Sequence, residues 1–331
     1  MKICLRESSR ASAPAKAILF GEHFVVYNRL AIVVAIDLRA HVNVRPRSDC
    51  KVVIESDVLG LCGEFKFDGV YRPIRGHFGD TKLKPIYAVA KRVLDIAGKR
   101  VGLDITVKSQ IPIGSGLGSS AAVIVATTAA VSNLLEMNLS RDEIFRLALE
   151  AEKIAHENPS GVDPAISTYG GLLAYRRSDG VRRLRVSVNL PLILGDTRVK
   201  RDTGKIVTCV SELRKLYPEI IEGVIDAGDR VARLAVEALE VGDLKTLGHL
   251  MNINHALLYA IGVSNWAIEE LVWAARRAGA LGAKLTGAGG GGCIMALAMP
   301  EDVGRIAEAI RAAGGEPIIA NIAHEGVRVE E

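Results

Sequence analysis

The sequence contains little of several residue types on which other functional classes depend. Its 331 residues include five cysteines, and glutamine occurs once, as Gln110. The cysteines are odd in number and none is spaced as in a zinc knuckle or a redox pair, which predicts free thiols in a reducing compartment. So little glutamine beside many Arg, Glu, Ile and Val is typical of a thermophile. No stretch reaches the roughly 18 apolar residues of a membrane span.

The chain also lacks an excess of either charge. Lys and Arg total 42 against 38 Asp and Glu, a net charge of +4 spread along the sequence. This balance predicts neither a nucleic-acid-binding stripe nor an acidic tail, and it suits a small anionic ligand. No apolar core of signal-peptide length precedes Ala11. We therefore expect a cytoplasmic protein that binds neither nucleic acid nor membrane.

The patterning predicts an α+β protein with a substantial core, because helices and strands mix without strict alternation and 49% of the residues are hydrophobic. We expect two domains, 1–180 and 181–331. Trp266 and Trp273 lie seven residues apart on one helical stripe and are expected in the core. Strands are predicted within 16–56 and over 101–107, 190–194 and 293–298, and helices over 84–97, 121–135, 140–156, 206–242, 244–259, 265–278 and 300–313.

The most informative segment is the glycine-rich sequence 111–120, IPIGSGLGSS. It follows a strand-like alternation and precedes a long small-residue helix. Ser119 or Ser120 would begin that helix, where unpaired N–H groups and the positive dipole end attract an anion. Glycines let the backbone come close to the anion. The segment therefore predicts a phosphate-binding loop, with an ordinary strand-to-helix turn as the alternative.

Three better-known glycine motifs do not fit this loop. A P-loop requires lysine after its last glycine, but Ser119 follows Gly118. The dinucleotide fingerprint requires another glycine at position 119. A hydrolase nucleophile elbow requires glycines on both sides of Ser115, where Ile113 and Leu117 stand. The positive charge that a phosphate needs must therefore come from elsewhere.

Lys16 is one candidate source of that charge. It lies inside the apolar segment 13–20, and a buried lysine is costly unless it meets an anion or a carboxylate. The alternative is an edge-strand lysine with its side chain in water. Glu22 and His23 follow Gly21 and could equally be polar turn residues.

Carboxylates could come from residues 152–163. Asp163 lies in the rigid polar turn 158–164 and could accept a proton from a hydroxyl, although an Asp before Pro is more often a turn-former. Glu152 carries a hard carboxylate suited to Mg²⁺, and its local alternative is a solvated helix side chain. His156 has no metal-spaced partner and is expected to cap a helix C-terminus.

Four separated segments together resemble the superfamily of galactokinase, homoserine kinase, mevalonate kinase and phosphomevalonate kinase (GHMP). The segments are 16–23, 114–122, 152–171 and 284–293, in the order that the superfamily has. Within it the chain is most similar to the mevalonate kinase family, because Phe-Val-Val-Tyr follows His23 where galactokinases have Thr-Asp-Tyr. Pro164 and Glu157 stand where the family often has Asn and Gly.

The resemblance implies the two-domain GHMP kinase fold, with a ribosomal-protein-S5-like α/β domain followed by a ferredoxin-like α+β domain. It implies ATP- and Mg²⁺-dependent phosphorylation of the 5-hydroxyl of mevalonate in isoprenoid biosynthesis, with mevalonate and ATP as ligands and a homodimer as one possible assembly. Alternatives are a phosphomevalonate kinase, a mevalonate 3-kinase, another small-acid kinase, a non-catalytic nucleotide sensor of the same fold, or, outside the superfamily, a dehydrogenase.

The resemblance also assigns roles to residues. Asp163 would be the catalytic carboxylate and Lys16 its cationic partner, while Ser120 and Glu152 would hold Mg²⁺. The ATP phosphates would meet Pro112, Gly114, Ser115, Gly116, Leu117, Gly118, Ser119 and Ser120. The substrate would meet Glu22, His23, Arg201, Thr203, Gly287, Ala288 and Gly289.

Overall fold

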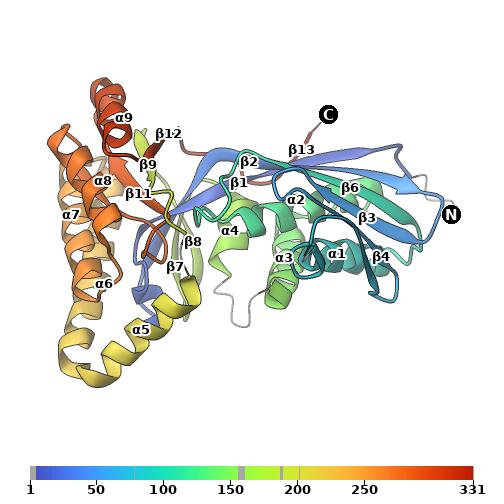
Figure 1. Ribbon diagram of the computed structural model, residues 1–331, viewed down its shortest axis with the longest axis horizontal. Helices are drawn as coiled ribbons and strands as arrows, with labels where there is room; N and C mark the ends of the chain where they lie inside the picture. The colour runs from blue at the N-terminus through green and yellow to red at the C-terminus, as the bar shows by residue number, and fades with distance from the viewer. Residues whose placement is uncertain (1–4, 78, 156–160, 187–188, 201, 331) are drawn as a thin grey trace.

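The structure is a computed structural model that describes residues 5–77, 79–155, 161–186, 189–200 and 202–330. The smaller of two β-sheets lies toward one end of an elongated molecule, and the larger one extends from beside it to the other end (Figure 1). The helices of residues 79–169 lie beside the larger sheet, and most of those of residues 203–312 lie beside the smaller one (Figure 1). This arrangement is the α+β fold that the patterning predicts.

The larger sheet has the order β13-β1-β2-β6-β3-β4-β5, and the hairpin β7-β8 joins it through β2. Its pairs are antiparallel except β3 with β6. The long strand β2 thus pairs with three neighbours and connects the parts of the sheet. The strands are β1 (Ser9–Phe20), β2 (Ala31–Arg47), β3 (Lys51–Ser56), β4 (Leu61–Lys66), β5 (Tyr71–Arg75), β6 (Gly102–Ser109), β7 (Leu172–Arg176), β8 (Gly180–Leu184) and β13 (Arg328–Glu330).

Four helices accompany this sheet: α1 (Gly79–Ile96), α2 (Ser119–Leu134), α3 (Arg141–Ala155) and α4 (Val162–Tyr169). Helix α2 is buried along nearly its whole length, because its small and apolar side chains allow close packing on β1 and β2. The predicted capping box begins α3, where the Ser140 backbone N–H and hydroxyl donate to Glu143 and the Glu143 N–H returns a bond to the Ser140 hydroxyl.

The apolar run at the start of β2 is covered on both faces. Ile32 and Val34 belong to the main core, whereas Val33 and Ala35 pack in a separate cluster with Ile166 of α4. Alternate residues of a strand point to opposite faces, so a continuous apolar run indicates a strand buried on both sides. This packing holds α4, which carries Asp163, against the sheet.

The smaller sheet has the order β10-β11-β9-β12, with all pairs antiparallel. Asp202, Asp243 and Asn265 accept bonds from backbone N–H groups at the starts of α5, α7 and α8, as N-cap side chains do. The strands are β9 (Leu192–Asp196), β10 (Gly282–Leu285), β11 (Cys293–Leu297) and β12 (Glu316–Ala320), and the helices are α5 (Thr203–Leu216), α6 (Pro218–Val241), α7 (Leu244–Ala260), α8 (Trp266–Arg277) and α9 (Val303–Ala312), with short 3-10 helices η1 (Phe24–Tyr27) and η2 (Pro300–Asp302).

The expectation that the two tryptophans are core residues is wrong. Trp266 is 76% exposed and Trp273 55% exposed. Helix α8 instead buries Ile268, Leu271 and Val272. The spacing of seven correctly places both indoles on one stripe of the helix, but that stripe faces outward.

The expected domain boundary after residue 180 falls at the start of β8, and the late strand β13 pairs with β1 of the first sheet. The boundary itself stays a prediction. Cys50, Cys62 and Cys209 are free thiols in the described part of the chain. Among the described residues, no helix combines the length and the apolarity that crossing a membrane requires.

Candidate active site

The glycine-rich loop connects β6 to α2 and opens the N-terminus of that helix. Gly114, Gly116 and Gly118 have φ angles of 76°, 79° and 74°, in the left-handed region that favours glycine. Gly118 is the N-cap residue and no side chain caps the helix, so its first N–H groups remain available to a ligand. Ser115 is buried and its hydroxyl donates to Pro112 O at 2.8 Å, which fixes the loop.

Lys16 lies directly behind this loop. Its backbone N–H donates to Leu117 O at 2.9 Å, and a Cβ atom at Gly118 would lie 2.7 Å from its Cγ. The Lys16 ammonium meets Asp163 Oδ1 at 3.1 Å, with the lysine side chain 8% exposed and the aspartate 28%. The loop itself contains no lysine, and Lys16 on β1 therefore provides a positive charge next to it. Lys16 is not a solvated edge-strand lysine.

Asp163 lies in the first turn of α4, after Gly161 at φ 82°. Residues 161–164 therefore start a helix, while His156 and residues 157–160 lie outside the described residues. The carboxylate that this helix carries contacts the Lys16 ammonium.

Glu152 completes this cluster from α3. Its side chain is buried, and among the described residues Oε2 has no hydrogen-bond partner. Burial, and after it the charge of Asp163, raise the pKa of Glu152 to about 8, although the charge of Lys16 opposes the shift. The local interpretation of Glu152 as a solvated helix carboxylate is therefore wrong. A buried, unpartnered carboxylate oxygen is suited to a cation.

A cavity of about 570 Å³ adjoins the loop. Gly114, Ser119 and Ser120 form one side of it, so the start of α2 faces directly into the space. Its other walls combine apolar side chains with two lysines, a lining that suits a flat apolar group attached to phosphates. These other residues include Val58, Leu59, Lys82, Lys84, Ile86, Val107, Ile113, Val123 and Ile124.

The first and last sequence motifs meet beside this cluster. Lys284 on β10 pairs with Glu22, and both side chains are fully buried. The Thr286 hydroxyl accepts from Ile18 N at 3.0 Å and donates to Ile18 O at 2.9 Å. His23 Nε2 lies 2.8 Å from Ala288 O. These contacts join segments that are more than 260 residues apart in the sequence.

The remaining predicted substrate residues differ in their surroundings. Gly287 and Ala288 are half-buried, whereas Gly289 is buried and a Cβ there would lie 2.1 Å from Val263 O. Gly289 thus permits close backbone packing. Thr203 lies exposed at the start of α5, and Arg201 lies outside the described residues.

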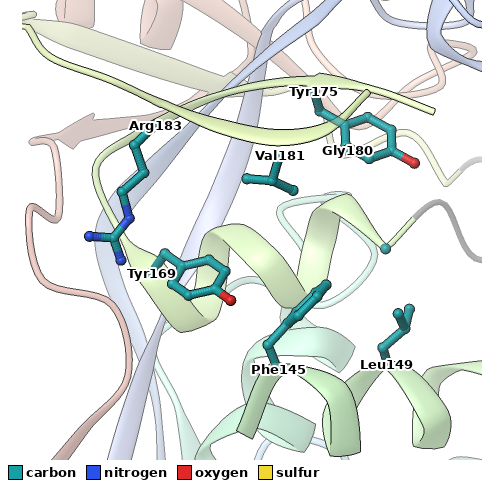
Figure 2. A pocket seen from close by; sticks show the side chains of 8 residues that line it. Phe145, Leu149, Tyr169, Tyr175, Gly180, Val181 and Arg183 are labelled. Atoms are coloured by element: carbon teal, nitrogen blue, oxygen red, sulfur yellow. The ribbon is translucent and has the colours of Figure 1, made fainter. Parts of the chain in front are cut away.

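A second cavity of about 310 Å³ lies between α3, α4 and the β7-β8 hairpin. Figure 2 shows Phe145 and Leu149 on α3 below it, Tyr169 on α4 at its side, and Val181 on β8 and Tyr175 on β7 above. None of its lining residues is a predicted catalytic, phosphate or substrate residue. The candidate active site is therefore the cluster of Lys16, Asp163 and Glu152.

Residue-based reasoning singled out neither Lys284 nor the two cavity lysines Lys82 and Lys84. Lys284 carries the same signal that identified Lys16, a lone lysine in an apolar strand. Lys82 and Lys84 carry no such signal, because lysines on an amphipathic helix are usually solvated.

The site combines a glycine-rich loop at a helix start with a lysine–aspartate pair and a buried carboxylate beside the pair. This combination is typical of a small-molecule kinase. The chain matches the model of the GHMP kinases N terminal domain over residues 84–171 and that of the GHMP kinases C terminal over residues 235–316.

Curated relatives and solved structures agree with this assignment. The mevalonate kinase of Pyrococcus abyssi is 43% identical over 329 residues, 97% of each chain. That of Aeropyrum pernix is 40% identical over 332 residues, 99% of this chain and all of the relative. The crystal structure of L. major mevalonate kinase in complex with R-mevalonate superposes with a TM-score of 0.82 at 30% identity, covering 96% of this chain and 98% of that one. The chain belongs to the mevalonate kinase family of the GHMP kinase superfamily.

Proposed function

We propose that this enzyme transfers the γ-phosphoryl group of ATP to the 5-hydroxyl of mevalonate, giving 5-phosphomevalonate and ADP for isoprenoid biosynthesis. The observation that carries the proposal is the contact of 3.1 Å between Lys16 Nζ and Asp163 Oδ1, directly behind the glycine-rich loop. This contact supports the proposal because it would provide a proton acceptor and a cation close to a loop-bound phosphate and an acceptor hydroxyl.

The nucleotide would occupy the cavity of about 570 Å³ beside the loop. Its phosphates would lie on the loop and the start of α2, where N–H groups and the helix dipole attract anions. Val58, Leu59 and Val107 would face the nucleoside, and Lys82 and Lys84 would add positive charge at the rim.

Mg²⁺ fits the residues present. The unpartnered Glu152 oxygen and the Ser120 hydroxyl are hard oxygen ligands, and Mg²⁺ typically combines one or two such groups with substrate phosphates. Within the described ranges no group of three or more His, Cys, Asp or Glu side chains could hold a metal ion. Phosphate oxygens are therefore the natural further ligands. When bound, Mg²⁺ would neutralise charge on the β- and γ-phosphates.

Asp163 would accept the proton of the 5-hydroxyl as that oxygen bonds to the γ-phosphorus. The bond from the γ-phosphorus to the bridging oxygen breaks, and ADP leaves with the electron pair. Lys16 would stabilise the negative charge that develops on the transferring group, and its short bond to Asp163 would hold the carboxylate toward the acceptor.

We propose that His23, Gly287 and Ala288 contact the acceptor mevalonate and that the buried residues Glu22 and Gly289 support them. Arg201 and Thr203 are further candidates for contact with the acceptor. The proposal further includes two domains, 1–180 and 181–331, which limited proteolysis would test. It includes a cytoplasmic location, tested by cell fractionation, and a possible homodimer, tested by sedimentation.

A coupled assay of ADP release tests the proposed reaction. Purified enzyme with ATP and Mg²⁺ is offered mevalonate, galactose, homoserine or phosphomevalonate in parallel. We expect rapid ADP formation only in the reaction that contains mevalonate. Equal turnover of another acceptor would contradict the assignment of mevalonate as substrate. The absence of turnover with every acceptor would favour a nucleotide sensor.

A further inference from the structure

The buried pair of Glu22 and Lys284 is the least expected feature beside the active site. Both side chains have no exposed surface, and the Lys284 ammonium also donates to Leu285 O at 2.6 Å. Asn254 on α7 donates to the other Glu22 oxygen at 3.2 Å. Burial raises the pKa of Glu22 and lowers that of Lys284, and their pairing opposes both shifts. Neither group faces open space in which a substrate could replace its partner.

The pair adjoins a backbone conformation that needs support. His23 has a φ of 61°, a region that residues other than glycine adopt at a cost. It is followed by η1, whose first turn is tied back by Val25 N to Gly21 O at 3.0 Å and by Val26 N to His23 O at 3.0 Å. The imidazole reaches Ala288 O four residues beyond Lys284. Glu22 and His23 are adjacent in the sequence, and their partners Lys284 and Ala288 are four residues apart.

We propose that Lys284 is a positioning residue for the acceptor side of the site: it holds Glu22, and Glu22 fixes His23 against Ala288. The proposal rests on the proposed function for its kinetic consequence. Glu22 then acts through the turn and not by contacting mevalonate itself. Removing one charge leaves the other buried without an opposite charge, which displaces the turn, whereas removing both charges leaves a neutral and nearly isosteric contact.

The test is a double-mutant cycle of Lys284→Met, Glu22→Gln and the double variant, each assayed with mevalonate and ATP. We expect each single variant to raise the KM for mevalonate by about tenfold, as loss of one well-placed hydrogen bond does. The double variant should return to within about threefold of wild type. The KM for ATP should change little, because none of Glu22, Lys284 and Asn254 lines the cavity beside the loop.

Arg176→Met is the matched control for stability. Arg176 donates to the mostly buried Asp229 at 2.8 Å, outside the site, so its loss should lower the melting temperature without changing the KM for mevalonate. If the cycle variants behave like this control, the pair is only structural and the proposal is overturned. A double variant as impaired as Glu22→Gln would instead indicate direct contact of Glu22 with substrate, and would also overturn it.

Two further measurements keep the outcomes distinct. If the single variants do not fold, Asn254→Ala removes only the amide donor to Glu22 and should raise the KM for mevalonate by about threefold. An unchanged KM for mevalonate in both Asn254→Ala and the double variant overturns the proposal. If wild type does not turn over mevalonate, the proposed function fails, but the ¹H–¹⁵N ring signals of His23 still test positioning. They should shift in each single variant and return in the double variant; unshifted signals in the singles refute it.

Discussion

Gly118→Ala tests the contact between the loop and Lys16. Gly118 has a φ of 74°, and a Cβ there would lie 2.7 Å from Lys16 Cγ and 3.3 Å from Cε. These atoms belong to the stem of the lysine, whose end is held by Asp163 at 3.1 Å. The methyl group must therefore displace the stem, the loop or both.

The cost has two parts. A left-handed conformation costs an alanine about 1–2 kcal/mol, and overpacking adds about 1–3 kcal/mol. Gly98 has a φ of 62° with nothing within 4 Å of a Cβ, so Gly98→Ala bears only the first part. We expect urea unfolding to show a loss of about 2–5 kcal/mol for Gly118→Ala and about 1–2 kcal/mol for Gly98→Ala.

Turnover should separate the variants more clearly. Displacing a catalytic group by about 1 Å can cost about 10²-fold in rate, so Gly118→Ala should lose about that much kcat while Gly98→Ala keeps wild-type kcat. Gly114→Ala shares the loop and a φ of 76° but has open space around its Cβ, so its loss should be smaller. The reasoning is refuted if Gly118→Ala and Gly114→Ala lose the same kcat in the ADP-release assay.

Three other predictions follow from the cluster and its surroundings. Asp163→Asn and Lys16→Met should each lower kcat by at least about 10²-fold with unchanged circular dichroism, since each removes a proton acceptor or a charge at the transferring group; near-normal turnover by folded Asp163→Asn would rule out its role. Glu152→Gln should raise the Mg²⁺ concentration for half-maximal rate at fixed ATP by about tenfold or more, and an unchanged Mg²⁺ titration would exclude Glu152 as a ligand. The pKa of His255 is lowered from 6.5 to about 4, mainly by burial and also by the charges of Arg276 and Lys284, although Glu269 opposes the shift. The unfolded chain then binds a proton that the folded one does not, so stability falls as pH drops from about 6.5 to about 4, by up to about 3 kcal/mol. Urea unfolding should show a flatter pH dependence in His255→Gln, and parallel curves would contradict the assignment.

Local patterns predicted most of the elements and half of the site. The glycine spacing predicted a tight turn before a helix, and the cost of burying a lone lysine predicted that Lys16 meets a carboxylate; the structure has both features. Both signals are local, because they depend on backbone conformation and on the free energy of burying charge. The capping box at Ser140 is local for the same reason.

What failed depends on packing between distant segments. The spacing of Trp266 and Trp273 specifies a stripe of α8 but not which face the sheet covers. Glu152 looks like any helix carboxylate in the sequence, and only the folded chain buries it near Asp163 and Lys16. The partner of Glu22 lies 262 residues away, so no local pattern reports their pairing.

The central claim is phosphoryl transfer to the 5-hydroxyl of mevalonate, and ³¹P NMR of the product tests it most directly. A phosphate ester at carbon 5 is attached to a methylene group, so its phosphorus signal should be split into a triplet by two protons. An ester at carbon 3 has no proton on the attached carbon. We predict a triplet that appears with ADP in equal amounts and is absent with Asp163→Asn. An unsplit ester signal, or ADP formed without a phosphate ester, would contradict the account.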